Sequence, residues 1–117
     1  MGTRCNITFE GSKVVLFQHW DGYPDGDNGV LERLQPLVTA FQDERGHEPD
    51  MLIAFVVGKF REGVTQVTGY RLDTKLSSDV EYIYRVKADG SIEVRQPNGA
   101  YFERPIYRNT RKYAPEV

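Results

Sequence analysis

The chain has 117 residues, of which 39% are hydrophobic and 27% charged, a composition typical of a globular domain. A chain of this length buries enough surface for one core without a disulfide or a metal, so we predict a single domain over residues 1–117 and exclude a disordered protein. The longest apolar run, residues 51–57, is far shorter than the roughly 20 residues that cross a bilayer, which argues against a membrane span.

The N-terminus and the cysteine content favour a cytoplasmic protein. No apolar run follows residues 1–6, so we expect no secretory signal. The single cysteine, Cys5, can form neither an internal disulfide nor a thiolate metal site, and we expect it to be a buried structural residue.

The net charge of −2 is unevenly distributed along the chain. Acidic side chains outnumber basic ones in residues 1–59, and the reverse holds in residues 60–117. The contrast is strongest in residues 95–113, where one glutamate stands against Arg95, Arg104, Arg108, Arg111 and Lys112. Any function must accommodate an acidic first half and a basic C-terminal segment.

The chain begins with a predicted β-hairpin, formed by residues 3–10 and 13–20 and closed by a two-residue turn at Gly11 and Ser12. Residues 14–17 are apolar on both faces of the second strand. We therefore expect that strand to lie inside the sheet rather than at its edge.

Residues 30–45 carry apolar side chains at helical spacing and predict an amphipathic helix that ends at Gly46. Pro36 lies within this pattern and predicts a kink. A second helix is predicted over residues 51–60, capped by Asp50. A strand is the alternative for that segment, because it is continuously apolar and contains two adjacent valines.

Three further strands are predicted over residues 64–72, 80–87 and 91–95, the last two joined by a turn at residues 88–90. The order is ββααβββ. It predicts an α+β fold with a mostly antiparallel sheet of about five strands and both helices on one face. Residues 96–117 are predicted to form a C-terminal strand or an extended arm.

The loop that leaves the second strand carries the strongest functional signal. It reads His19-Trp20-Asp21-Gly22-Tyr23-Pro24 and combines a titratable ring, two aromatic rings and a carboxylate. We select four candidate ligand-binding residues in it: His19, Trp20, Asp21 and Tyr23. The alternative is a structural corner, in which the aromatic rings close the core and Gly22 supplies a positive φ.

Metal binding and catalysis have weaker support. The spacing of Asp21, Asp25 and Glu32 matches part of a calcium-binding loop, but Tyr23 and Pro24 depart from that pattern, so these three remain weak metal candidates. The chain has no phosphate-binding glycine loop and no serine-hydrolase or zinc-protease motif. We expect no cofactor and lean towards a protein that is not an enzyme, with a metal-dependent hydrolase as an alternative.

The basic C-terminal segment suits an anionic ligand. Arg104, Arg108 and Arg111 alternate with aromatic residues, and guanidinium groups bind phosphate while aromatic rings stack on bases. Arg71 and Arg85 are weaker candidates for the same role. Duplex DNA is not an expected partner, because the isoelectric point is about 5.7. The arm could instead pack on the sheet, or close a homo-oligomer with a ligand pocket between subunits.

Two motifs together resemble a known group of proteins. They are T-R-x-x-I-x-F (Thr3, Arg4, Ile7, Phe9) and the H-W-D-G-Y-P string of residues 19–24. The chain is similar in these motifs, in the two-helix segment and in residues 79–84 to small uncharacterised proteins of phages and prophages. The resemblance implies a counter-defence role in the cytoplasm of a host cell.

We therefore expect a non-enzymatic accessory protein that captures a small anionic, nucleotide-like ligand. The principal alternative is a protein-binding inhibitor that covers a basic surface of a host defence complex, such as a CRISPR-like complex, with Asp21, Asp25 and Asp27. The two hypotheses share Asp21.

Overall fold

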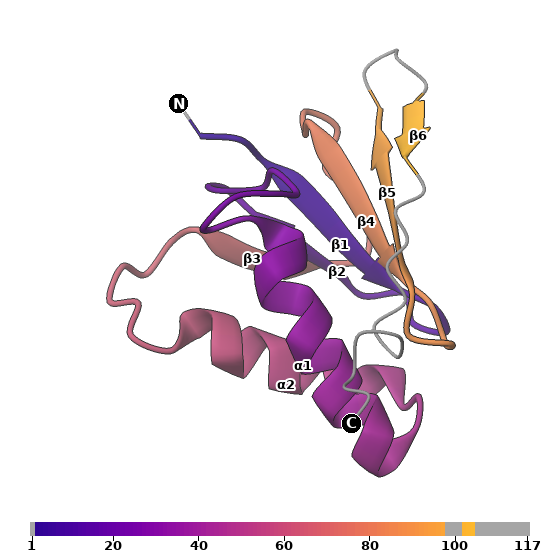
Figure 1. The fold of residues 1–117 in the computed structure, drawn as a ribbon. Helices are drawn as coiled ribbons and strands as arrows, with labels where there is room; N and C mark the ends of the chain where they lie inside the picture. The colour runs from indigo at the N-terminus through magenta and orange to yellow at the C-terminus, as the bar shows by residue number, and fades with distance from the viewer. Residues whose placement is uncertain (1, 98–101, 105–117) are drawn as a thin grey trace.

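The computed structural model describes residues 2–97 and the backbone of residues 102–104. These residues form one six-stranded sheet in the order β3-β2-β1-β4-β5-β6, with two helices on one of its faces (Figure 1). The strands are β1 (Cys5–Phe9), β2 (Val15–Gln18), β3 (Tyr70–Asp73), β4 (Tyr82–Val86), β5 (Ile92–Gln96) and β6 (Phe102–Arg104).

The predicted α+β class and the order ββααβββ are confirmed, and the short β6 adds one strand within residues 96–117, the segment predicted as a strand or an extended arm. The rest of that segment lies outside the described residues. The sheet is mixed, because β1 and β4 are parallel while the other neighbouring pairs are antiparallel. The parallel pair arises because the chain, after leaving β3, crosses the sheet on the face opposite the helices. It then enters β4, which lies on the side of β1 away from β2. Asn6 holds this crossing through its side-chain amide, which donates to the carbonyl of Ser77 at 3.1 Å.

Both helices confirm the predicted periodicity. α1 (Val30–Arg45) is one helix that includes Pro36, and Gly46, with a φ of 74°, ends it by donating its N–H to the carbonyl of Gln42. α2 (Pro49–Arg61) is a helix rather than the alternative strand. The predicted cap at Asp50 is wrong, because this residue lies inside the first turn, after Glu48 at the N-cap and a proline.

Two strand boundaries differ from the sequence prediction. Residues 64–69 are not part of β3, which begins only at Tyr70, after Gly69 with a φ of 111°. The N-terminal hairpin has a connection longer than two residues, because β1 ends at Phe9 and β2 starts at Val15. β2 lies between β1 and β3, as its apolar pattern predicted.

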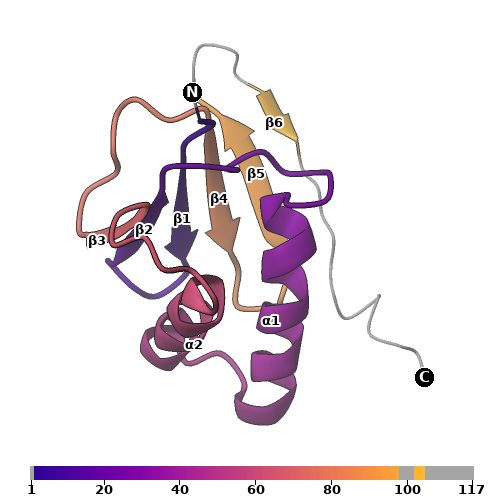
Figure 2. The ribbon, with the colours of Figure 1, turned by 90° about the vertical axis from the view of Figure 1, so that its left-hand side faces the viewer.

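The core lies between the helices and the covered face of the sheet (Figure 2). α1 lies nearer to β5 and α2 nearer to β3. Along each strand alternate residues point into this core, which places Ile7, Leu16, Tyr84 and Val94 together against Leu34, Val38, Leu52 and Val56 of the helices. In the part of the chain that is described, neither helix has the length and apolar character to cross a membrane.

Candidate functional site

The His-Trp-Asp-Gly-Tyr-Pro loop is anchored to the core by its backbone. Gln18, whose side chain is buried at the end of β2, donates through Nε2 to the carbonyls of Trp20 and Asp21. The Gly22 carbonyl accepts a 2.6 Å bond from the buried hydroxyl of Tyr84, and its N–H donates to the Thr3 carbonyl at 2.8 Å. These bonds fix the loop as a corner of the fold.

Two details of that corner differ from the structural alternative given by the sequence. The positive φ belongs to Asp21, at 58°, and not to Gly22. Glycine is needed at position 22 for space instead, because a Cβ there would lie 2.7 Å from the carbonyl oxygen of Thr3. Trp20 does not close the core, since 41% of its surface is exposed.

Trp20 lines a hollow of about 440 Å³ at the ends of β2 and β3. We name this the Trp20 hollow; its described lining residues are Phe17, His19, Trp20, Val67, Thr68, Gly69, Tyr70 and Arg71. The Arg71 guanidinium lies 4.4 Å from the centre of the Phe17 ring, and the His19 ring meets the indole edge-on at 4.8 Å. The hollow therefore combines aromatic faces with a cation.

The indole of Trp20 is held in place by two glycines. A Cβ on Gly69 would lie 3.0 Å from the indole, and one on Gly2 would lie 2.5 Å from it. The absence of side chains at these positions lets the backbone pack directly against the ring. Trp20 is thus both exposed and fixed, which reduces the entropy cost of stacking a ligand on it.

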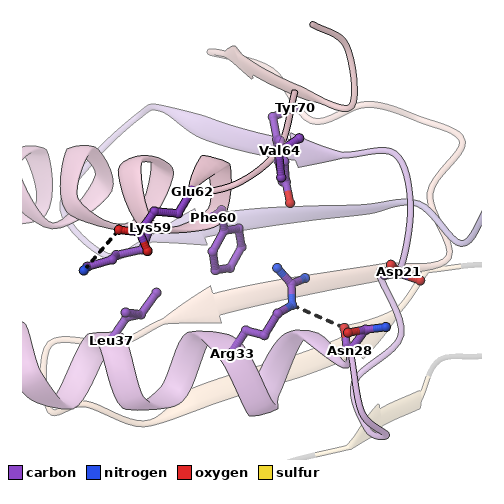
Figure 3. Close-up of a pocket in the computed structure, with 9 residues that line it drawn as sticks. All are labelled: Asp21, Asn28, Arg33, Leu37, Lys59, Phe60, Glu62, Val64 and Tyr70. Atoms are coloured by element: carbon purple, nitrogen blue, oxygen red, sulfur yellow. Dashed lines mark hydrogen bonds and ion pairs between the residues drawn. The ribbon is translucent and has the colours of Figure 1, made fainter. Parts of the chain in front are cut away.

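A second groove lies on the other side of the same loop, between α1 and the end of α2 (Figure 3). We name this the Arg33 groove; it has a volume of about 460 Å³ and is lined by Asp21, Asn28, Arg33, Leu37, Lys59, Phe60, Glu62, Val64 and Tyr70. Arg33 points from α1 into its centre, with its guanidinium 4.4 Å from the centre of the Phe60 ring.

The cations of the Arg33 groove are engaged by the protein. Arg33 donates through Nη2 to Gln18 Oε1 at 3.1 Å and through Nε to the carbonyl of Asn28 at 3.3 Å. Lys59 Nζ lies 3.6 Å from a carboxylate oxygen of Glu62. Because Asp21 also lines this groove, two carboxylates oppose an anion there. None of the described residues that line the Trp20 hollow carries a carboxylate.

The structure divides three of the predicted site residues between these two places. His19 and Trp20 line the Trp20 hollow, whereas Asp21 lines the Arg33 groove. The Tyr23 hydroxyl donates to Asp21 Oδ1 at 3.1 Å, and this bond raises the pKa of Tyr23. The side chains of Arg104, Arg108 and Arg111 lie outside the described residues.

Sequence reasoning missed most of the remaining lining residues. Arg71 was a weaker candidate and proves to belong with Trp20, while Phe17 and the segment of residues 67–70 gave no signal. The register of β2 against β3, which pairs Phe17 with Arg71, brings them together. These lining residues could be identified from the sequence only by predicting that β2 pairs with β3 in this register.

The structure gives no support to a metal site or a nucleophile in the described part of the chain. There, no three His, Cys, Asp or Glu side chains gather closely enough to hold a metal ion, so the weak candidates Asp21, Asp25 and Glu32 do not form a site. Cys5 is fully buried, and this burial raises its pKa to about 12. Its thiolate form is therefore scarce near neutral pH.

No family model matches the chain, and no curated protein or solved structure shows significant similarity to it.

Proposed function

We propose that this protein is a non-enzymatic accessory protein, of the kind carried by phages and prophages, that captures a small anionic, nucleotide-like ligand in the Trp20 hollow. The observation that carries the proposal is the presence of Trp20 and Arg71 in one hollow without a carboxylate among its described lining residues. An indole stacks on a base, and a guanidinium binds phosphate through paired donors.

The dimensions of the hollow fit this ligand class. Its volume of about 440 Å³ falls within the range of roughly 300–1,000 Å³ found for small-molecule sites. Thr68 and Gly69 add backbone and hydroxyl groups that can orient a ligand. A counter-defence role would follow if the captured ligand were a nucleotide messenger of the host. The predicted phosphate contacts of Arg104, Arg108 and Arg111 are not required for this proposal.

Intrinsic fluorescence provides a direct test, because Trp20 is the single tryptophan of the chain. The protein is titrated with AMP, ATP and a cyclic dinucleotide, with inorganic phosphate as the probe that lacks a base. We expect a saturable change in Trp20 emission with at least one nucleotide and none with phosphate at the same concentration. If none of the nucleotides binds saturably, the proposal is refuted.

Two variants locate the site. Arg71→Gln removes the cation of the hollow and is expected to weaken nucleotide binding about tenfold or more, which corresponds to about 1.4 kcal/mol. Arg45→Gln makes the same charge change at the end of α1, beside Glu48 and away from the hollow, and is expected to leave binding unchanged. Equal effects of the two variants would place the ligand elsewhere.

Native mass spectrometry of the purified protein, followed by release under denaturing conditions, identifies a ligand retained from the host.

A second candidate function rests on the exposure of the acidic loop. Asp21, Asp25 and Asp27 are all exposed between β2 and α1, so the loop presents several carboxylates to a partner. This supports the inhibitor hypothesis, in which the loop covers a basic surface of a defence protein. If it holds, co-purification with such a complex is lost when the three aspartates become asparagine but survives Arg71→Gln.

A further inference from the structure

β3 forms one edge of the sheet, and within the described residues it has a neighbouring strand only on the side of β2. The direction of its backbone groups follows from the ladder. His19 donates its N–H to the Gly69 carbonyl at 2.8 Å, and hydrogen-bonded pairs alternate along an antiparallel ladder. The N–H and C=O of Leu72 therefore point away from β2, where a further strand would accept and donate hydrogen bonds.

Apolar side chains are exposed along this edge. Leu72 is 53% exposed, and Val67, just before β3, is 88% exposed. Beside them lies a groove of about 260 Å³ between β3 and α2, lined by Leu16, Val57, Arg61, Val67, Tyr70, Arg71 and Leu72. An exposed strand edge with apolar side chains is a template for pairing with another strand.

We propose that β3 pairs antiparallel with β3 of a second copy of this chain, across a two-fold axis at Leu72. A two-fold axis perpendicular to the sheet keeps the helices of both copies on the same face. It places one residue directly opposite the same residue of the other copy, so the register is centred on a residue and not on the peptide bond between two. With the axis at Leu72, Leu72 of one copy faces Leu72 of the other, and the two residues exchange both backbone hydrogen bonds. The paired leucines then lie beside the two grooves between β3 and α2.

Charge selects this register over its neighbour. With the axis at Leu72, Arg71 of each copy lies opposite Asp73 of the other on the face away from the helices, which gives two pairs of opposite charge. With the axis at Arg71 or at Asp73, that residue would face the same residue of the other copy, which sets like charges opposite each other. Opposite charges directly across two strands stabilise their pairing, and like charges oppose it. β3 is therefore self-complementary in charge only when centred on Leu72.

The dimer does not rest on the proposed function, but it affects the same arginine. Arg71 lines the Trp20 hollow, and a partner carboxylate opposite it would reduce the attraction of the hollow for an anion. Ligand binding and dimerisation are therefore expected to oppose each other, by the same factor in both directions.

Sedimentation velocity over a dilution series of the full chain tests the dimer. We expect a concentration-dependent dimer that Leu72→Asp abolishes, because two carboxylates would then face each other at the axis. Leu76→Asp is the matched control: Leu76 is 51% exposed but lies beyond the end of β3, so this variant is expected to dimerise normally. A monomer at every concentration, or a dimer unaffected by Leu72→Asp, would overturn the proposal.

A charge exchange tests the register. Asp73→Arg places two arginines opposite each other and is expected to weaken the dimer, whereas the double variant Arg71→Asp, Asp73→Arg restores opposite charges and is expected to recover it. Circular dichroism at a dilution where all variants are monomeric confirms that each is folded. If the double variant dimerises no better than the single one, the axis does not lie at Leu72.

Discussion

Two arginines of this fold stack on aromatic rings at the same distance but in different settings. Arg33 and Arg71 each place a guanidinium 4.4 Å from a ring centre, on Phe60 and Phe17 respectively. Arg33 also donates to the buried Gln18 amide and to a loop carbonyl. Arg71 lies on an exposed strand edge and donates to the hydroxyl of Ser77. The same stacked pair is therefore part of the folded corner in one place and lines the proposed binding site in the other.

Gln18 connects the two sides of the loop. Its Oε1 accepts from Arg33, and its Nε2 donates to the carbonyls of Trp20 and Asp21. The network that occupies Arg33 thus also sets the position of Trp20. The hydrogen bonds of Arg33 and Gln18 on the groove side therefore help to hold Trp20 in the hollow, although the Arg33 groove and the Trp20 hollow share few lining residues.

The largest expected effect is the loss of stability in Arg33→Ala. The substitution leaves the buried Gln18 oxygen without this donor and removes the cation from the Phe60 ring. Loss of a partner for a buried acceptor costs roughly 1–3 kcal/mol, so we expect the free energy of unfolding to fall by about 2–3 kcal/mol in urea denaturation. A loss no larger than that of Arg45→Ala would show that Arg33 is as dispensable as a surface residue.

Arg71→Ala is expected to have a smaller effect on stability, below about 1 kcal/mol, because an exposed stacked cation contributes roughly 0.5–1 kcal/mol. The same urea experiment measures it, in dilute protein where no dimer forms. Nucleotide binding, by contrast, should fall in this variant. If Arg71→Ala destabilises the monomer as much as Arg33→Ala, the two arginines are equivalent structural residues and the comparison fails.

The difference between these arginines could not be predicted from the sequence. Periodicity identified both helices and the inner position of β2, because those signals lie within one segment. It placed β3 too early, since the valines of residues 64–67 satisfy a strand pattern that the positive φ of Gly69 interrupts. The candidate site depends on pairing between distant segments: Trp20 and Arg71 line the same hollow only because β2 lies beside β3. The loop looked like one site, yet Trp20 lines the hollow and the next residue, Asp21, lines the groove.

The smallest expected effect concerns Tyr23, which donates a hydrogen bond to Asp21 of the Arg33 groove. Its hydrogen bond to Asp21 raises its pKa above the ordinary value of 10.0. A group whose pKa is raised by folding contributes stability below its unfolded pKa and loses that contribution as the pH rises through the folded value. Thermal unfolding from pH about 8 to about 11 should therefore show a slightly steeper loss of stability in the wild type than in Tyr23→Phe. Equal slopes would show that the bond does not persist in solution.

Because Tyr23 does not line the Trp20 hollow, the same variant should bind nucleotides as the wild type does. Weaker binding would mean that the two sides of the loop act as one site.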